Sequence, residues 1–269
     1  MSTTGLPRVV ASDCDGTLLR SDGTVSERTK EVLAAVEEAG TTVILVTARP
    51  PRWMHELADV VGGHGLAICG NGAFLYDVAA REVIGHRLMD PALVAEILGE
   101  IRAELPEVSF ALESLEGFAR EPDFARVSGR RDAEWLVGSV DEMVVHPPGK
   151  VLVRHPHWPV DELHDRVAAV VGPRAQVSHS GAPGLTEIGA TGVTKGLALA
   201  EWCAEHDVPA SAVWAFGDMP NDLPMLTFAG RSFAVANAHP DVLAAATDRA
   251  PANDRDGVAT VLHRALALG

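Results

Sequence analysis

Short apolar runs recur along the chain and alternate with segments whose apolar residues fall at helical spacing. The runs are rich in β-branched residues and nearly free of charge, which is typical of strands buried on both faces. We predict such strands at Arg8–Ser12, Thr41–Val46, Leu66–Cys69, Ala212–Phe216 and Ser232–Val235.

The segments between these runs carry start and stop signals of helices. Ser26 is a candidate N-cap, and Gly40 ends the apolar spacing that follows it. Further helices are predicted at Pro51–Val61, Thr194–His206, Asn221–Phe228, Pro240–Ala246 and Gly257–Leu266. Strands that alternate with helices in this way indicate a parallel sheet with helices on both faces.

The middle of the chain, residues 78–187, has a different pattern. Its strands are shorter and mixed with helices: the predicted strands are Val108–Leu112, Met143–Val145, Val151–Arg154 and Gln176–Ser178, and the predicted helices are Pro91–Glu104 and Val160–Val170. We therefore predict an α/β protein. A Rossmann-like parallel-sheet core, residues 1–77 and 188–269, carries an inserted α+β domain, residues 78–187.

Composition narrows the kinds of partner. The chain has 269 residues, of which 47% are hydrophobic, and its formal net charge is −15. We expect no nucleic acid partner, because phosphate backbones are held by clustered Lys and Arg. A site for an anionic substrate must be made locally positive by a metal ion, a Lys, an Arg or backbone amides.

The cysteines and the lengths of the apolar runs indicate where in the cell we expect the protein. Cys14, Cys69 and Cys203 are widely spaced, as expected of reduced thiols in a cytoplasmic protein. The N-terminus does not resemble a signal peptide, and no apolar run approaches the ~18 residues that span a bilayer. We expect a cytoplasmic protein that does not contact a membrane; the sequence leaves its oligomeric state open.

The first candidate motif, DCDGT at 13–17, directly follows a predicted strand. In an extended backbone Asp13 and Asp15 lie on the same side. Two adjacent carboxylates repel each other, and a Mg²⁺ ion between them would remove that repulsion. One carboxylate can then act as a nucleophile and the other as a general acid and base. The alternative is a turn rich in Asp and Gly.

Two further motifs offer phosphate ligands. Thr47-Ala48-Arg49 follows the second strand, and its hydroxyl and guanidinium suit phosphate oxygens. Lys195 begins a helix that Thr194 can cap, where a cation opposes the helix dipole and therefore suggests an anion site. The alternatives are a solvated Arg and a surface Lys.

The fourth motif, GDMPND at 217–222, follows the strand Ala212–Phe216. Asp218 can complete a metal site, Asp222 can bind the metal through water or orient Lys195, and Asn221 can donate its amide to phosphate. An Asp-rich helix cap is the alternative. Three of the four motifs follow buried strands, where open α/β sheets bind ligands, so together they favour phosphoryl chemistry.

These motifs resemble those of the haloacid dehalogenase superfamily, and more narrowly its Cof-type phosphatases of subclass IIB. The matching segments are DCDGTLL at 13–19, TAR at 47–49, CGNGA at 69–73, TKGLAL at 194–199, GDMPNDLPML at 217–226, VANAHPDV at 235–242 and NDRDGVA at 253–259. The insertion falls where that family carries its type-two cap. The resemblance implies that this cap closes over the site, excludes water and selects the leaving group.

The resemblance also implies roles for individual residues. Asp13 would be the nucleophile, and Asp15 the acid and base that gives its backbone carbonyl to the metal. The implied Mg²⁺ ligands are Asp13, Asp15, Asp218 and Asp222, with Asp222 also supporting Lys195. The implied phosphate- or substrate-binding residues are Thr47, Ala48, Arg49, Lys195 and Asn221. Ala48 departs from the family, which usually has Gly at this position.

The implied function is a Mg²⁺-dependent phosphatase that hydrolyses a small phosphorylated metabolite through an aspartyl-phosphate intermediate. Sugar phosphates are expected first, and cofactor phosphates such as pyridoxal phosphate or flavin mononucleotide next. A phosphosugar mutase with the same nucleophile is one alternative. A non-catalytic phosphate-binding sensor is the other; it predicts eroded motifs, whereas all four motifs are present in this chain.

Overall fold

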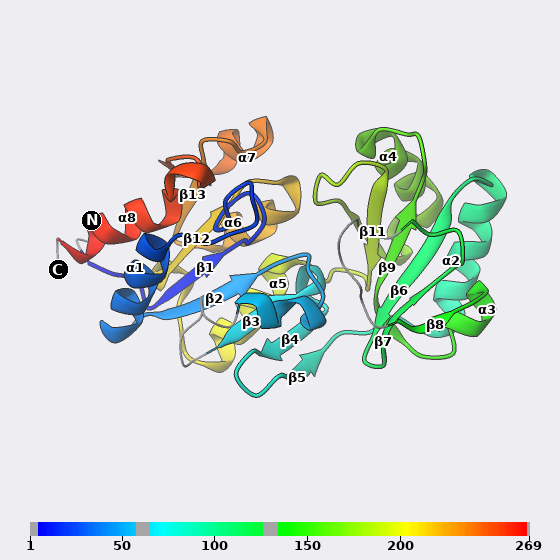
Figure 1. Ribbon diagram of the computed structural model, residues 1–269, viewed down its shortest axis with the longest axis horizontal. Coiled ribbons are helices and arrows are strands. Elements are labelled where there is room, and N and C mark those ends of the chain that lie inside the picture. The colour runs from blue at the N-terminus through cyan, green and yellow to red at the C-terminus, as the bar shows by residue number, and fades with distance from the viewer. Residues whose placement is uncertain (1–4, 58–64, 126–133, 268–269) are drawn as a thin grey trace. The chain divides into compact units, whose positions relative to one another are not determined.

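The structure is a computed structural model that describes residues 5–57, 65–125 and 134–267 (Figure 1). The chain divides into two compact units, Met1–Gly85 with Thr194–Gly269 and the inserted His86–Val193. The two boundaries between these units, at 85/86 and 193/194, fall later in the chain than the boundaries predicted at 77/78 and 187/188. Strand pairing explains the shift: β5 (Glu82–His86) extends the sheet of the first unit, and β11 (Leu185–Gly189) pairs within the second.

The first unit is built on an eight-stranded sheet of order β14-β13-β12-β1-β2-β3-β4-β5. The strands β14 to β3 in this order run parallel, as predicted. They are β1 (Val9–Ser12), β2 (Thr42–Val46), β3 (Leu66–Cys69), β12 (Val213–Gly217), β13 (Arg231–Val235) and β14 (Asp248–Ala250). The short strand β4 (Phe74–Asp77) turns back antiparallel to β3.

Five α-helices flank this sheet. They are α1 (Glu27–Glu38), α5 (Lys195–Glu205), α6 (Leu223–Phe228), α7 (Pro240–Ala245) and α8 (Gly257–Leu266). Side chains cap two of them as predicted, because Ser26 Oγ accepts the Thr29 N–H and Thr194 Oγ1 accepts the Leu197 N–H, each at 3.1 Å. Helix α1 packs against α8, and α5 against α6. The helix predicted at Pro51–Val61 is a 3₁₀ helix over Pro51–Leu57, and residues 58–61 lie outside the described residues.

The second unit has a six-stranded sheet of order β10-β11-β9-β6-β7-β8. Its strands are β6 (Ser109–Ser114), β7 (Gly117–Arg120), β8 (Glu134–Val137), β9 (Pro148–Arg154), β10 (Gln176–Ser178) and β11, antiparallel except for the β7–β8 pair. Apolar side chains of β6 and β9 share one core with helices α2 (Pro91–Glu104) and α4 (Val160–Val171). This unit is the predicted α+β insertion.

The strand predicted at Met143–Val145 is wrong. Residues Val140–Met143 form the short helix α3, with Ser139 as its N-cap. The Glu142 carboxylate accepts the Ser139 backbone N–H at 2.8 Å, which completes a capping box. The β-branched Val144 and Val145 favoured a strand, but a Ser-x-x-Glu cap stabilises the start of a helix just before them.

Candidate active site

The register of the central strands brings the predicted motifs to one edge of the sheet. Ser12, the last residue of β1, pairs with Phe216 of β12 and with Leu45 of β2. Asp13 therefore leaves the sheet beside the ends of both neighbouring strands, where Asp218 and Thr47 follow. This edge is the carboxyl end of the parallel strands, where open α/β sheets bind their ligands.

A buried lysine joins two of the carboxylates. Lys195, at the first position of α5, is 1% exposed. Its Nζ donates to Asp13 Oδ1 and to Asp222 Oδ1, both at 2.6 Å. The other Asp222 oxygen accepts the backbone N–H groups of Asp218 and Met219 at 2.9 and 3.0 Å. Asp222 is thus held by donors on both oxygens and fixes Lys195 against Asp13.

Asp218 approaches the same cluster from β12. Its Oδ1 accepts the Thr17 hydroxyl at 2.8 Å, and its backbone carbonyl accepts the His239 N–H at 2.8 Å. Gly16 has a φ of +82°, and a Cβ at this position would collide with Asp218 Oδ2. A glycine is therefore required for the loop after Asp13 to pass this close to the second carboxylate.

Burial shapes the protonation of the cluster. Burial raises the pKa of Asp13 well above its ordinary value, an effect that Lys195 opposes and that Asp222 and Asp218 strengthen. Burial also raises the pKa of Asp218 to about 6, together with the charge of Asp222 and against the Thr17 hydrogen bond. For Lys195, burial would lower the pKa, but Asp13 and Asp222 outweigh burial and raise it. Lys195 therefore stays charged, while the crowded carboxylates lack sufficient positive charge.

The cluster fits a hard divalent cation. One carboxylate oxygen from each of Asp13, Asp218 and Asp222 lies within 4.8 Å of the other two. Asp13 Oδ2 is buried and has no hydrogen-bond partner among the described residues. The Lys195 ammonium offsets one of the three negative charges, and Mg²⁺ prefers carboxylate oxygens. These three residues can therefore hold the metal ion that the sequence predicted.

Asp15 lies apart from this cluster. Its side chain is 59% exposed, and both of its oxygens accept hydrogen bonds from Arg49, at 2.7 Å from Nε and 2.5 Å from Nη2. Such a two-fold contact fixes the orientation of a carboxylate as well as pairing its charge. The structure therefore joins the first two motifs through this ion pair.

The remaining predicted residues lie near the ends of β2 and β12. Thr47 is buried, and its hydroxyl oxygen accepts the Arg49 N–H at 3.0 Å, while Ala48 is half-buried between them. Asn221 Nδ2 donates to Asn71 Oδ1 at 3.1 Å. Asn221 Oδ1 is buried with no hydrogen-bond partner among the described residues, so this amide has an unused acceptor.

Three residues of the site were not singled out from the sequence. Thr17 binds Asp218, Asn71 binds Asn221, and Asn237 Nδ2 donates to the Gly16 carbonyl at 2.8 Å. Each lies within a segment that carries the family resemblance. Asn71 also lies between two glycines in the turn after β3, and its φ of 58° is the left-handed conformation that asparagine adopts more readily than most residues.

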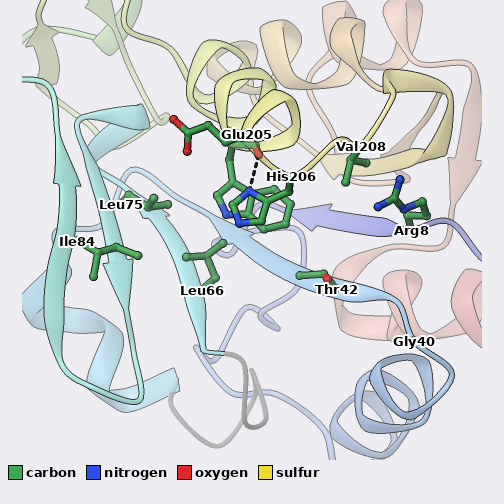
Figure 2. A pocket seen from close by; sticks show the side chains of 10 residues that line it. Arg8, Gly40, Thr42, Leu66, Leu75, Ile84, Glu205, His206 and Val208 are labelled. Carbon is green, nitrogen blue, oxygen red and sulfur yellow. Dashed lines mark hydrogen bonds between the residues drawn. The ribbon is translucent and has the colours of Figure 1, made fainter.

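A separate pocket lies at the other end of the sheet (Figure 2). It is lined by Arg8, Thr42 and Leu66, which precede or begin β1, β2 and β3, and by Glu205 and His206 at the end of α5. It contains none of the predicted site residues. The predicted chemistry therefore concerns the carboxyl edge of the sheet and not this pocket.

Comparison with known proteins identifies the family. A family model described as haloacid dehalogenase-like hydrolase matches residues 10–262, and the chain belongs to this family of hydrolases. Pyridoxal phosphate phosphatase YbhA of Escherichia coli (strain K12) is 30% identical over 269 residues, which cover 95% of this chain and 97% of that protein. The 5-amino-6-(5-phospho-D-ribitylamino)uracil phosphatase YitU of Bacillus subtilis (strain 168) is 25% identical over 266 residues, 97% of this chain and 98% of that protein.

A solved structure supports the fold. The crystal structure of SMU.1108c from Streptococcus mutans UA159 matches with a TM-score of 0.84 at 23% identity, over 97% of this chain and 99% of that one. This structure confirms the fold class, and the family model and the named relatives confirm the family and the enzyme class, a phosphatase. Among the described helices, none is long and apolar enough to cross a membrane.

Proposed function

We propose that this protein is a Mg²⁺-dependent phosphatase that cleaves a small phosphomonoester through a phosphorylated Asp13. The observation that carries the proposal is Asp13 Oδ2, a buried carboxylate oxygen to which no described residue donates a hydrogen bond, beside Lys195 and two further carboxylates. A carboxylate oxygen in this state is available to a metal ion or to phosphorus.

The proposed reaction has two halves. Asp13 attacks phosphorus, the bond to the ester oxygen breaks, and Asp15 gives that oxygen a proton. Asp15 then takes a proton from water as the water attacks the aspartyl phosphate, which releases inorganic phosphate and restores Asp13. Mg²⁺ would be held by Asp13, Asp218, Asp222 and the backbone carbonyl of Asp15. There it would neutralise charge on the phosphoryl oxygens. Thr47, Ala48, Arg49, Lys195 and Asn221 remain the proposed residues on the phosphate side.

Arg49 has a second part in this proposal. Its guanidinium donates to both oxygens of Asp15, so this ion pair must open and Asp15 must take up a proton before Asp15 can protonate the ester oxygen. The guanidinium released in this way can then bind the phosphate. We assign to the inserted unit, residues 78–187 in the sequence-based boundaries, the role of the cap that selects the leaving group.

The relatives favour cofactor-like phosphomonoesters among the small metabolites. One relative is named as a pyridoxal phosphate phosphatase and another as a phosphatase of a phosphorylated ribitylaminouracil. We therefore place pyridoxal phosphate and flavin mononucleotide beside sugar phosphates in the first substrate panel. Cytoplasmic location and the absence of a nucleic acid partner also stay part of the proposal.

The test is phosphate release from this panel and from p-nitrophenyl phosphate, with and without Mg²⁺. We expect Mg²⁺-dependent turnover, and a loss of about 10⁴-fold or more in Asp13→Asn. Borohydride reduction during turnover should convert phosphorylated Asp13 into homoserine, which mass spectrometry detects at residue 13.

The alternatives give different results. A mutase would isomerise sugar phosphates without releasing phosphate. No turnover of any panel member with Mg²⁺ would favour the phosphate sensor, and turnover without a reducible intermediate would exclude the Asp13 mechanism.

A further inference from the structure

A linked pair of asparagines from the C-terminal part of the chain holds the loop that follows the nucleophile. Asn237, after β13, donates from Nδ2 to the Gly16 carbonyl at 2.8 Å. Its Oδ1 accepts the Asn253 backbone N–H at 3.0 Å, and Asn253 Nδ2 donates to the Leu19 carbonyl at 2.9 Å. Two carbonyls of one loop are therefore held by two side chains, and the Asn237 side chain is itself bound to the Asn253 backbone.

The two carbonyls belong to the turn that carries Asp15. The Leu19 N–H bonds back to the Cys14 carbonyl at 2.8 Å, and a β-bridge joins Asp15 to Leu19, so residues 14–19 form a closed turn. Asn237 and Asn253 bind this turn at Gly16, next to Asp15, and at Leu19, its bridge partner. The pair therefore restrains the backbone that follows Asp15, at the next residue and at the bridge partner.

The position of Gly16 has little freedom. On one side its Cα faces Asp218, so that even a methyl group there would collide with the carboxylate. On the other side its carbonyl is held by Asn237. Loss of the Asn237 amide would leave Asp218 as the remaining restraint of these two, and the Gly16–Thr17 peptide next to Asp15 could rotate.

The two asparagines differ in how far they are buried. Asn253 is 5% exposed, whereas Asn237 is an exposed residue. Water competes for the hydrogen bonds of an exposed amide, so these bonds contribute little to global stability. The Asn237 side chain is exposed and binds a loop of the site that lies 221 residues away in sequence. We attribute this contact to the geometry of that loop and not to global stability.

We propose that Asn237 is a positioning residue that sets the orientation of Asp15 toward the leaving-group oxygen, and that Asn253 orients Asn237. This inference rests on the proposed function, in which Asp15 protonates the leaving group. Asn237 acts through the backbone and touches no reacting atom.

The experiment measures kcat/KM over a series of substituted phenyl phosphates, from p-nitrophenyl phosphate to phenyl phosphate. Asn237→Asp removes the donor to Gly16 but keeps the acceptor for Asn253, and Asn237→Ala removes both without adding charge. A poor leaving group needs its proton more, so both variants should lose about tenfold or more on phenyl phosphate. On p-nitrophenyl phosphate they should lose less than about threefold.

Asp254→Ala is the matched control. Asp254 lies in the same C-terminal segment and binds Ser21, beyond the turn, through two hydrogen bonds of 2.8 Å. It should match the wild type at both ends of the series. Thermal unfolding of Asn237→Ala and Asp254→Ala, compared with that of the wild type, checks that both variants are folded.

Asp15→Asn, measured in parallel, separates this inference from the proposed function. If Asp15→Asn is selectively slow with poor leaving groups and both Asn237 variants follow the wild type, the positioning role is wrong and the acid role stands. If Asp15→Asn shows no dependence on the leaving group, the proposed acid itself is wrong and the inference is overturned with it.

Discussion

Lys195 offsets part of the negative charge of the site, because its ammonium is buried between two carboxylates at 2.6 Å. In Lys195→Met those carboxylates stay buried without their cation. Breaking a buried ion pair costs roughly 3–5 kcal/mol, and we expect a loss of stability of this size without Mg²⁺. Urea unfolding monitored by circular dichroism measures it, and kcat should fall by about 10²–10³-fold.

Lys30→Met is the control for Lys195. Lys30 pairs with Glu27 on the surface of α1 at 3.0 Å, and such surface pairs contribute at most about 1 kcal/mol. The control should unfold near the wild-type urea midpoint. If Lys195→Met also unfolds there, the ammonium does not stabilise the site as inferred.

Alanine substitutions at two glycines of the loop after Asp13 distinguish the cost of backbone strain from the effect of crowding at the site. Gly16 and Gly23 have nearly the same φ, +82° and +81°, so an alanine at either position costs about 1–2 kcal/mol. A Cβ at Gly16 would also collide with Asp218, whereas no atom lies within 4 Å of one at Gly23. We expect Gly23→Ala to lose stability but keep kcat, and Gly16→Ala to lose both.

The measurements are thermal unfolding and kcat at saturating Mg²⁺. Equal activity in the two alanine variants would show that Gly16 serves the turn alone and not the approach to Asp218.

Residue chemistry was predictable where a motif follows a strand, and less so where partners come from distant segments. Asp13, Lys195, Asp218 and Asp222 meet as their positions at strand ends and at a helix start implied. Asn237 was not found, since a surface asparagine has no local signal for a partner 221 residues away. The contact of Arg49 with Asp15, instead of a free guanidinium, also depends on two strands lying side by side.

At the scale of elements, the close packing of α5 on α6 positions Lys195. A Cβ at Gly196, the next residue, would collide with the backbone of Pro224 in α6. Gly196→Ala should therefore push the two helices apart, with a destabilisation of about 1–3 kcal/mol and a loss of kcat. Urea unfolding and steady-state kinetics measure the two effects.

Gly99 in the interior of α2 is the matched helical glycine. Apart from its chain neighbours and the backbone of its own helix, no atom of the described residues lies within 4 Å of a Cβ at this position. Gly99→Ala should stabilise the protein by about 0.5–1 kcal/mol, because alanine is the better helix former, and should leave kcat unchanged. The opposite signs of the two substitutions are the expected result; a stabilising Gly196→Ala would contradict the close packing.

Helices and strands were predictable where the sequence pattern that indicates them was long and consistent. The five predicted parallel strands are apolar runs and α5 has a side-chain cap, and the structure has them close to the predicted bounds, whereas the short parallel strand β14 was not predicted. Strand β5 was missed because its exposed residues alternate with half-buried ones over five positions, and this pattern lacks the apolar run of a central strand. At Met143–Val145 three apolar residues favoured a strand, whereas the cap at Ser139 begins a helix.

At the scale of the whole molecule, the net charge of −15 opposes the binding of an anionic substrate. The site counters this with Lys195 and with three carboxylates that can collect a cation. Such an arrangement makes the positive charge of the site depend on the metal ion. Substrate affinity and folding stability should then respond to Mg²⁺ together.

We therefore expect Mg²⁺ to raise the free energy of unfolding in a saturable way. A ligand that binds the folded state alone adds about 2.7 kcal/mol at one hundred times its dissociation constant. Urea unfolding over a Mg²⁺ series measures the gain, and NaCl at matched ionic strength is the control, because it screens the net charge without occupying the site. Asp218→Asn removes one ligand charge and should lose most of the gain from Mg²⁺ while keeping the response to NaCl. Equal gains from Mg²⁺ and NaCl in the wild type would show that the ion acts on the overall charge and not at Asp13, Asp218 and Asp222.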